Sequence, residues 1–225
     1  RFYGVKLIGL ELDEFGIVPE YLSDILNKHR VDALFCTPTL QNPTTVTMPV
    51  ERRQAIIDLC RQHNLLIIED DAHGVLVDNA PISIQSMAPE RTIFLTSISK
   101  ALSPGLRAGW MVVPSSLRHR FFSAIRGSSW MATPFTLELT SHLIESGAAF
   151  KIRDQQNAEV ARRKKKVEGY LLNLNAQTNL GSPHFWIEIE EPLRAANVAE
   201  QLKNRKVLVN SSETFAVGRN AIPQF

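Results

Sequence analysis

The sequence predicts an α/β fold with a largely parallel sheet flanked by helices, followed by a partial small α+β domain. Short β-prone runs alternate with segments of helical periodicity through the first half of the chain, which is typical of parallel sheets. The run LLIIED, residues 65–70, is apolar on both faces, as a buried parallel strand requires. With 225 residues, of which 44% are hydrophobic, the chain is long enough for one substantial core and part of a second.

The first elements follow from their hydrophobic periods. Residues 5–12 form a short β-prone run, and Leu22 and Leu26 then fall on one face of an expected helix. VDALFC, residues 31–36, predicts the next strand. Its continuation, residues 37–45, contains prolines that a central strand does not tolerate, so a loop is expected there.

The helix expected after this loop covers residues 47–64, with Thr47 as its N-cap and Pro49 in its first turn. The strand at 65–70 follows, and two further strands are expected at residues 92–96 and 109–113. Helices alternate with these strands, so the sheet is expected to be mostly parallel.

The character of the chain changes after Pro114. We expect helices at residues 116–126, 133–147, 151–174 and 194–206, and strands at residues 184–190 and 207–212. This pattern divides the chain into a large domain, residues 1–146, and a small domain, residues 147–225. Because the chain starts at Arg1 and its last strand pattern is unfinished, we expect both domains to be incomplete.

Composition excludes several classes of function. The 25 basic and 23 acidic residues nearly balance, so net charge gives no case for nucleic-acid or membrane binding by this chain. Cys36 and Cys60 have no metal-ligand spacing, so we expect neither a metal site nor a disulfide framework, and a cytoplasmic location. The basic run RRKKK, residues 162–166, is interpreted as a solvated helix face, and Trp130 and Trp186 as packing residues.

Polar side chains follow three of the predicted strands, at the sheet edge where α/β proteins bind ligands. Within TSISKALSPGLRAGW, Pro104 and Gly105 turn the chain so that Arg107 returns toward Lys100. Ser97, Ser99 and Arg107 could bind a phosphate, and Lys100 could form a Schiff base. An amine beside a phosphate site is what pyridoxal 5'-phosphate requires.

The same cofactor needs an acid beside its pyridine nitrogen. Asp70, at the end of the buried strand, can provide it. His73 and Asn42 could each hydrogen-bond the 3'-oxygen of the cofactor. Each residue taken alone also has a simpler interpretation: a solvated lysine, a solvated strand end, or an ordinary Asn-Pro turn.

Taken together, these segments resemble the fold-type I pyridoxal-phosphate enzymes of the class I/II aminotransferase family. The resemblance implies that Lys100 is the Schiff-base lysine, Asp70 the partner of the pyridine nitrogen and Asn42 a contact of cofactor and substrate. His73 departs from the family pattern, which usually has Tyr there. Arg219 does not occupy the position of the family's carboxylate-binding arginine.

The family's phosphate-binding turn and stacking aromatic ring would precede residue 1, and its site is completed across a homodimer. We therefore expect the 225 residues alone to bind pyridoxal phosphate weakly or not at all.

Three further segments, GSSWMATPFTLEL, HFWIEIEEPLRA and ETFAVGRNAIP, resemble the aminotransferase-like C-terminal domain of the MocR subfamily of GntR transcriptional regulators. This resemblance implies a sensor of the cofactor, or of an amino acid or amine ligand, that acts on DNA through a separate N-terminal domain. The alternative is a catalytic aminotransferase that moves an amino group from an amino acid to a 2-oxo acid. Both classes keep Lys100 and Asp70, so these residues do not separate them.

Overall fold

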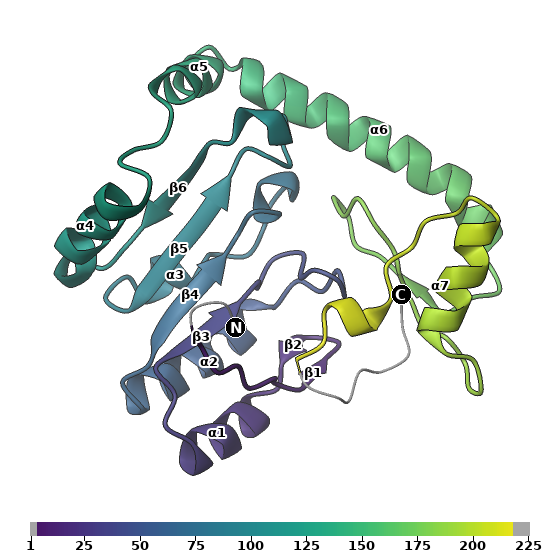
Figure 1. The fold of residues 1–225 in the computed structure, drawn as a ribbon, viewed down its shortest axis with the longest axis horizontal. Helices are drawn as coiled ribbons and strands as arrows, with labels where there is room; N and C mark the ends of the chain where they lie inside the picture. The colour runs from purple at the N-terminus through teal and green to yellow at the C-terminus, as the bar shows by residue number, and fades with distance from the viewer. Residues whose placement is uncertain (1–3, 218–225) are drawn as a thin grey trace.

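The computed structural model of the protein describes residues 4–217 (Figure 1). Its helices are α1 (Pro19–Lys28), α2 (Val50–Gln62), α3 (Ile84–Met87), α4 (Arg118–Ser128), α5 (Pro134–Glu145), α6 (Ala148–Leu171) and α7 (Ala195–Asn204). Its strands are β1 (Leu12–Asp13), β2 (Gly16–Ile17), β3 (Ala33–Cys36), β4 (Leu66–Asp70), β5 (Thr92–Ser97), β6 (Gly109–Val112), β7 (Ala176–Gln177) and β8 (Trp186–Ile187). Short 3-10 turns lie at Gly74–Leu76, Pro104–Leu106, Ser115–Leu117 and Ser212–Thr214.

The central sheet has four strands in the order β3-β4-β5-β6. β3, β4 and β5 run parallel, with Cys36 opposite Glu69 and Asp70 opposite Leu95. β6 pairs antiparallel with β5, which places Ser97 opposite Gly109. The prediction of a largely parallel sheet flanked by helices is therefore confirmed.

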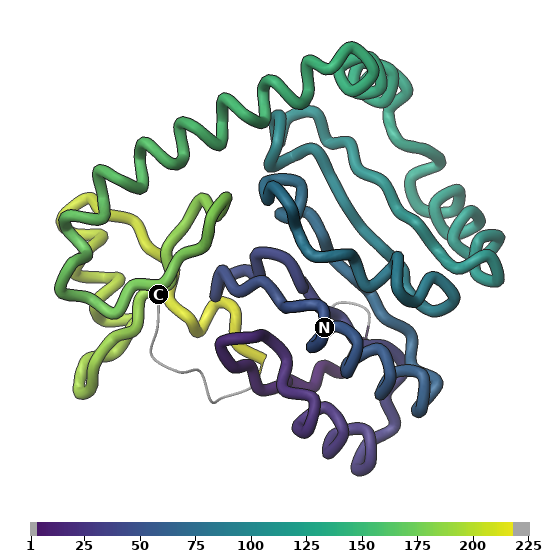
Figure 2. Tube along the Cα trace, turned by 180° about the vertical axis from the view of Figure 1, so that it is seen from behind, coloured from purple at the N-terminus to yellow at the C-terminus, as the bar shows by residue number. Residues whose placement is uncertain are grey.

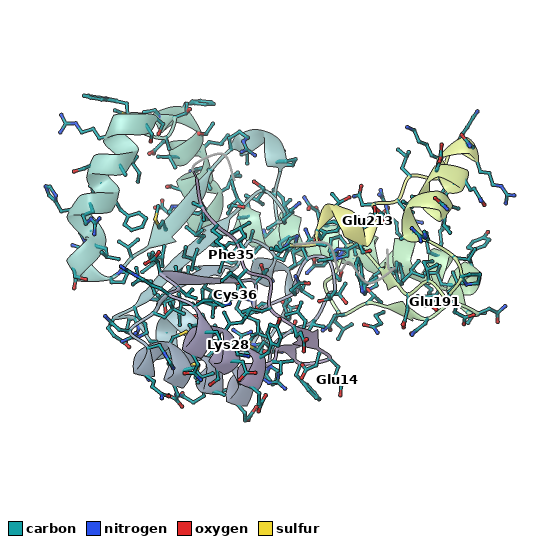
Figure 3. All side chains as sticks on the ribbon, turned by 60° about the horizontal axis from the view of Figure 1, so that its bottom comes forward. Glu14, Lys28, Phe35, Cys36, Glu191 and Glu213 are labelled. Atoms are coloured by element: carbon teal, nitrogen blue, oxygen red, sulfur yellow. The ribbon has the colours of Figure 1, made fainter. Side chains whose placement is uncertain are left out.

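The main hydrophobic core lies between this sheet and helices α1, α2 and α3. Its fully buried members include Leu22 of α1, Ile56 and Ile57 of α2 and Ile67 of β4. Burying such side chains contributes about 1.5 to 3 kcal/mol each, so this face dominates the stability of the sheet. The other face is more open: Phe35 of β3, labelled in Figure 3, is 60% exposed.

The expected helices are all present, although α2 begins later than predicted. Pro49, not Thr47, is its N-cap. The Thr47 hydroxyl accepts a hydrogen bond from the backbone N–H of Leu40 instead, at 3.2 Å, and so fixes the loop before the helix. The N-cap prediction was wrong because the hydroxyl had a second backbone donor within reach, which only the folded loop provides.

Two predicted strands were wrong. Residues 5–11 and 207–211 have no strand assignment, and the strand expected at 184–190 is reduced to β8. Val5 and Leu7 are each more than half exposed, and Leu208 is 83% exposed. A strand needs a hydrogen-bonded neighbour, and β-prone residues alone do not supply one.

Helix α6 runs from α5 to the group formed by β7, β8 and α7 (Figures 1 and 2). The chain then returns, so that Val217 lies against Gly9 near the start, with its carbonyl oxygen 3.2 Å from where a Cβ at Gly9 would be. In both views the segment around residues 212–217 lies beside β1 and β2. The division into domains at residue 147 stays a prediction.

Several side-chain interpretations can be compared with the structure. Trp186 is 7% exposed and packs as expected, whereas Trp130 is 61% exposed and stacks with Arg126, 5.0 Å from the ring centroid. The packing interpretation of Trp130 was wrong, because Trp130 lies in the bend after α4 and nothing within residues 4–217 buries its ring. Within the basic run only Lys164 is partly buried, with its amine 2.8 Å from the Asn179 carbonyl. Cys36 and Cys60 are buried free thiols.

Among the described residues, no helix has the length and apolar character that crossing a membrane requires.

Candidate functional site

The loops that follow β3, β4 and β5 meet at the carboxyl edge of the parallel strands. They carry the residues expected to bind the cofactor: Asn42 after β3, Asp70 and His73 at the end of β4, and Ser97, Ser99, Lys100 and Arg107 after β5. The start of the loop after β4 is held against β5, because the Asp71 N–H donates to the Leu95 carbonyl at 2.8 Å. Parallel strands place their carboxyl ends together, so the fold itself assembles this set.

Lys100 lies in a turn directly after β5. The Leu102 N–H donates to the Ile98 carbonyl at 2.8 Å, and the Ile98 N–H donates to the Ala108 carbonyl at 3.4 Å, closing the loop between them. Arg107, adjacent to Ala108, therefore lies in the same closed loop as Lys100. Within residues 4–217 neither of these two exposed side chains has a hydrogen bond or ion pair with the protein. Both cations are available to an anionic ligand.

Asp70 and His73 lie on the turn after β4. The Asp70 carboxylate accepts a hydrogen bond from the backbone N–H of Ala72 at 3.1 Å. His73 is 9% exposed, and burial, followed by the positive charges of Lys100 and His184, lowers its pKa below the usual 6.5, against the opposing effect of Asp70. The His73 imidazole is therefore neutral at pH 7 and can donate one N–H.

Asn42 is exposed on a tight loop after β3. The Gln41 N–H donates to the Val46 carbonyl at 2.8 Å, and the Thr45 N–H donates back to the Gln41 carbonyl at 2.7 Å. The Gln41 side-chain oxygen also accepts from both the N–H and the hydroxyl of Thr44. These bonds fix the loop and leave the Asn42 side chain in solvent.

A buried polar cluster beneath this edge was missed by the sequence analysis. Arg53 of α2 is fully buried and donates to the carbonyls of Pro38, Met48 and Ile82 and to the Thr39 hydroxyl, at 2.9 to 3.1 Å. Glu69, also fully buried, lies 3.9 Å from Arg53 and accepts the backbone N–H groups of Ile84 and Gln85. An arginine inside an amphipathic helix usually faces solvent, so periodicity alone gave no signal for this role.

Asp71 adjoins the same cluster. The pKa of its carboxyl is raised from 3.8 to about 6, first by burial and then by the charge of Glu69, while the hydrogen bond from Thr39 and the charge of Arg53 oppose the rise. A side chain at Gly74 would overlap the Asp71 carboxylate as it is placed, so Asp71 would have to move. Of the three consecutive acids, Glu69 and Asp71 thus support the loops and Asp70 remains for a ligand.

His184 is a second residue that the sequence analysis missed. It precedes β8, and its Nε2 lies 3.1 Å from the carbonyl oxygen of Pro43, next to Asn42. Burial lowers its pKa below the usual value, the hydrogen bond to Pro43 opposes this, and the charges of Lys100 and Lys164 add to the lowering. Its distance of 141 positions from Pro43 explains why spacing gave no signal.

Part of the backbone strain lies in these loops. Among residues 4–217, seven non-glycine residues have positive φ, and three of them, Leu40, Thr45 and Arg107, lie in the loops after β3 and β5. Each such residue costs on the order of 1 to 3 kcal/mol, and strain of this kind is typical of ligand sites.

The residues present fit pyridoxal 5'-phosphate. An amine and a guanidinium without protein partners lie in one loop, a carboxylate ends the neighbouring strand, and a neutral imidazole lies close enough to the amine to be affected by its charge. Among the described residues, no cluster of three or more histidine, cysteine or acidic side chains could hold a metal ion.

The fold and this site define the class of protein. The family model of aminotransferase class I and II matches residues 2–183, and the chain belongs to that family. The fold is that of solved aminotransferases: the Pyrococcus horikoshii kynurenine aminotransferase aligns with a TM-score of 0.89 at 23% identity, over 96% of this chain and 57% of that one. Cystalysin from Treponema denticola, a structure that contains pyridoxal 5'-phosphate, aligns with a TM-score of 0.81 at 19% identity, over 96% of this chain and 57% of that one.

The relatives with curated names include both transcriptional regulators and aminotransferases. The HTH-type transcriptional regulator YdeF of Bacillus subtilis is 27% identical over 98% of this chain and 47% of its own length. The regulator TauR of Rhodobacter capsulatus is 27% identical over 94% of this chain and 44% of its own. The bovine kynurenine/alpha-aminoadipate aminotransferase is 32% identical, but over 63% of this chain and 36% of its own. The chain thus spans about half the length of the regulators it matches.

Proposed function

We propose that this chain is the aminotransferase-like sensor domain of a MocR-type transcriptional regulator, carrying pyridoxal 5'-phosphate on Lys100. The observation that carries the proposal is coverage: HTH-type regulators match 94 to 98% of the chain, whereas the bovine aminotransferase matches 63%. The part of the chain that the bovine aminotransferase does not match therefore supports the regulator assignment more than the enzyme assignment.

Each site residue has a role in this proposal. The bound cofactor supplies an aldehyde that reacts with amines and a ring that accepts electrons from the attached carbon. Lys100 provides the amine, and Asp70 holds a proton on the ring nitrogen. His73 and Asn42 hydrogen-bond the 3'-oxygen, and Ser97, Ser99 and Arg107 bind the phosphate. An amino acid or amine would compete with Lys100 for the aldehyde carbon.

A second function remains supported. The bovine relative is an aminotransferase at 32% identity, the highest identity among the relatives given above. In that function the Lys100 amine would move a proton to and from the carbon that carries the amino group. The regulator and the enzyme share Lys100 and Asp70 and differ in whether product is released repeatedly.

The covalent step is tested in the complete protein. Pyridoxal 5'-phosphate is added, the bond is fixed with borohydride, and the labelled peptide is identified by mass spectrometry. We expect the label on Lys100, its loss in Lys100→Ala, and its retention in the control Lys165→Ala, which removes an exposed lysine of α6. Label confined to lysines other than Lys100 would contradict the site.

The two functions are separated by a second experiment. The complete protein is mixed with a panel of amino acids and 2-oxoglutarate, and its DNA binding is measured with and without the cofactor. We expect sequence-specific DNA binding that changes with the cofactor, together with at most one turnover. Multiple turnovers without DNA binding would establish the enzyme instead.

A further inference from the structure

His184 joins the part of the chain after α6 to the loop that carries Asn42. With the ring neutral at pH 7, the 3.1 Å distance from Nε2 to the Pro43 oxygen identifies the tautomer, because a carbonyl can only accept and Nε2 must carry the proton. The contact links residues 141 positions apart, and it involves the residue next to Asn42.

The backbone around His184 is fixed before the ring reaches Pro43. The hydroxyls of Thr178 and Ser182 both donate to the His184 carbonyl, at 2.9 and 3.0 Å. Ser182 is fully buried, and its hydroxyl also accepts the His184 N–H at 3.3 Å. The turn that carries the ring thus has its own hydrogen bonds, and the bond from the ring to Pro43 couples this turn to the Asn42 loop.

Helix α6, which precedes that part of the chain, contacts the other two site loops. Asn157 of α6 donates to the Leu76 carbonyl at 3.0 Å, and Gln156 donates to the Leu102 carbonyl at 2.8 Å. These bonds hold the loops after β4 and β5. A cavity of about 420 Å³ separates the segments 44–47 and 177–179, so side-chain packing does not fill that part of the interface. The His184 bond holds the Asn42 loop beside this gap.

We propose that His184 is a positioning residue: it holds the Asn42–Pro43 segment in place and transmits cofactor binding at Lys100 to residues 178–187. The transmission rests on the proposed function, whereas the positioning does not. A ligand that contacts Asn42 stabilises the loop after β3, and a bonded partner is then stabilised with it. Without the bond, the two segments respond separately.

The positioning is tested by amide hydrogen exchange of the complete protein without cofactor. His184→Phe keeps a ring but removes the donor, and His184→Gln keeps an N–H donor. We expect His184→Phe to speed exchange at Gln41, Thr45 and Met48 about tenfold while β4 amides are unchanged, and His184→Gln to restore at least part of the protection. Unchanged exchange at these three amides in His184→Phe would overturn the proposal.

A measurement on the unsubstituted protein covers the case in which His184→Phe disturbs folding. Nitrogen-15 NMR of the imidazole reports which ring nitrogen carries the proton. We expect a neutral ring protonated on Nε2. A ring protonated only on Nδ1 could not donate to Pro43 and would overturn the positioning role.

The transmission is tested with pyridoxal 5'-phosphate as the probe. In the unsubstituted protein we expect the cofactor to slow exchange in both segments, 38–48 and 178–187. In His184→Phe it should slow only 38–48. If residues 178–187 still respond in His184→Phe, the transmission is wrong. If neither segment responds in the unsubstituted protein, both the proposed function and the transmission are wrong. The positioning role is still decided by hydrogen exchange of the cofactor-free protein.

Discussion

Asp71 supports the loops of the site, but its buried charge lowers the free energy of unfolding at neutral pH. Its carboxyl is buried beside Glu69, and its pKa is raised from 3.8 to about 6. The folded protein therefore holds this proton more tightly than the unfolded chain. The stabilising effect is complete below about pH 4 and is lost as the pH rises through about 6.

We expect Asp71→Asn to stabilise the protein at pH 8. One pKa unit corresponds to about 1.4 kcal/mol, so removing the buried charge should raise the free energy of unfolding by on the order of 2 to 3 kcal/mol, and by far less at pH 4. The amide oxygen still accepts the Thr39 hydroxyl bond. Urea unfolding of the unsubstituted protein and of Asp71→Asn across pH 4 to 8 measures this difference. The histidines titrate in both proteins, so their contribution cancels in the comparison.

Asp32→Asn, at an exposed aspartate before β3, is the control and should change stability little at either pH. An Asp71→Asn effect that is equal at pH 4 and pH 8 would show that the buried charge is not its cause.

Helix α2 stabilises the loop after β3 through Arg53, which donates hydrogen bonds to Pro38 and Thr39. Removing one partner of a buried ion pair costs about 3 to 5 kcal/mol, because the other charge stays buried. We expect Arg53→Met to lower the free energy of unfolding by about this amount, and the double variant with Glu69→Gln to lose less than the sum of the single variants. Denaturant unfolding measures both.

Arg52→Met is the matched control for Arg53→Met. Arg52 is the neighbouring residue, and its ion pair with Asp13, at 3.0 Å, is partly exposed. Its loss should cost about 1 kcal/mol or less. Equal losses for Arg52→Met and Arg53→Met would refute the distinction between them.

The turn before β8 also depends on a single backbone position. Gly181 has a φ of 80°, and a Cβ there would lie 2.7 Å from the Leu76 carbonyl oxygen. We expect Gly181→Ala to destabilise the protein by about 1 to 3 kcal/mol and to increase proteolysis of residues 176–190. Gly169→Ala in α6 is the control, since a Cβ there meets nothing within 4 Å; it should be neutral or stabilising by up to about 1 kcal/mol. Similar thermal unfolding of the two variants would contradict this explanation.

On the scale of the whole molecule, the main feature of the surface is a group of exposed apolar side chains on and next to α4 and α5. Phe122 is 72% exposed, Phe135 74% and Trp130 61%. Exposed apolar groups of this size favour association between proteins. We expect the 225-residue chain to self-associate as its concentration rises, and the double variant Phe122→Glu with Phe135→Glu to associate less without losing stability. Sedimentation velocity measures this; Leu208→Glu, which removes an exposed leucine after α7, should leave association unchanged.

Much of the fold could be predicted because helical and strand periods are local properties. The helices and the strands β3 to β6 were expected near their observed places. The candidate site residues after those strands share one edge because parallel strands bring their ends together. The strands expected at residues 5–12 and 207–212 failed for the opposite reason, since pairing depends on a neighbour that sequence alone does not supply.

The sequence by itself determined the parallel sheet, the family resemblance and the loop that holds both Lys100 and Arg107. Tertiary structure alone decided that Arg53 and Glu69 are buried together, that Asp71 is a supporting carboxyl with a raised pKa, and that His184 reaches Pro43. The physical reason is distance along the chain. Periodicity reports contacts a few residues apart, whereas burial and charge pairing depend on segments that meet only after folding.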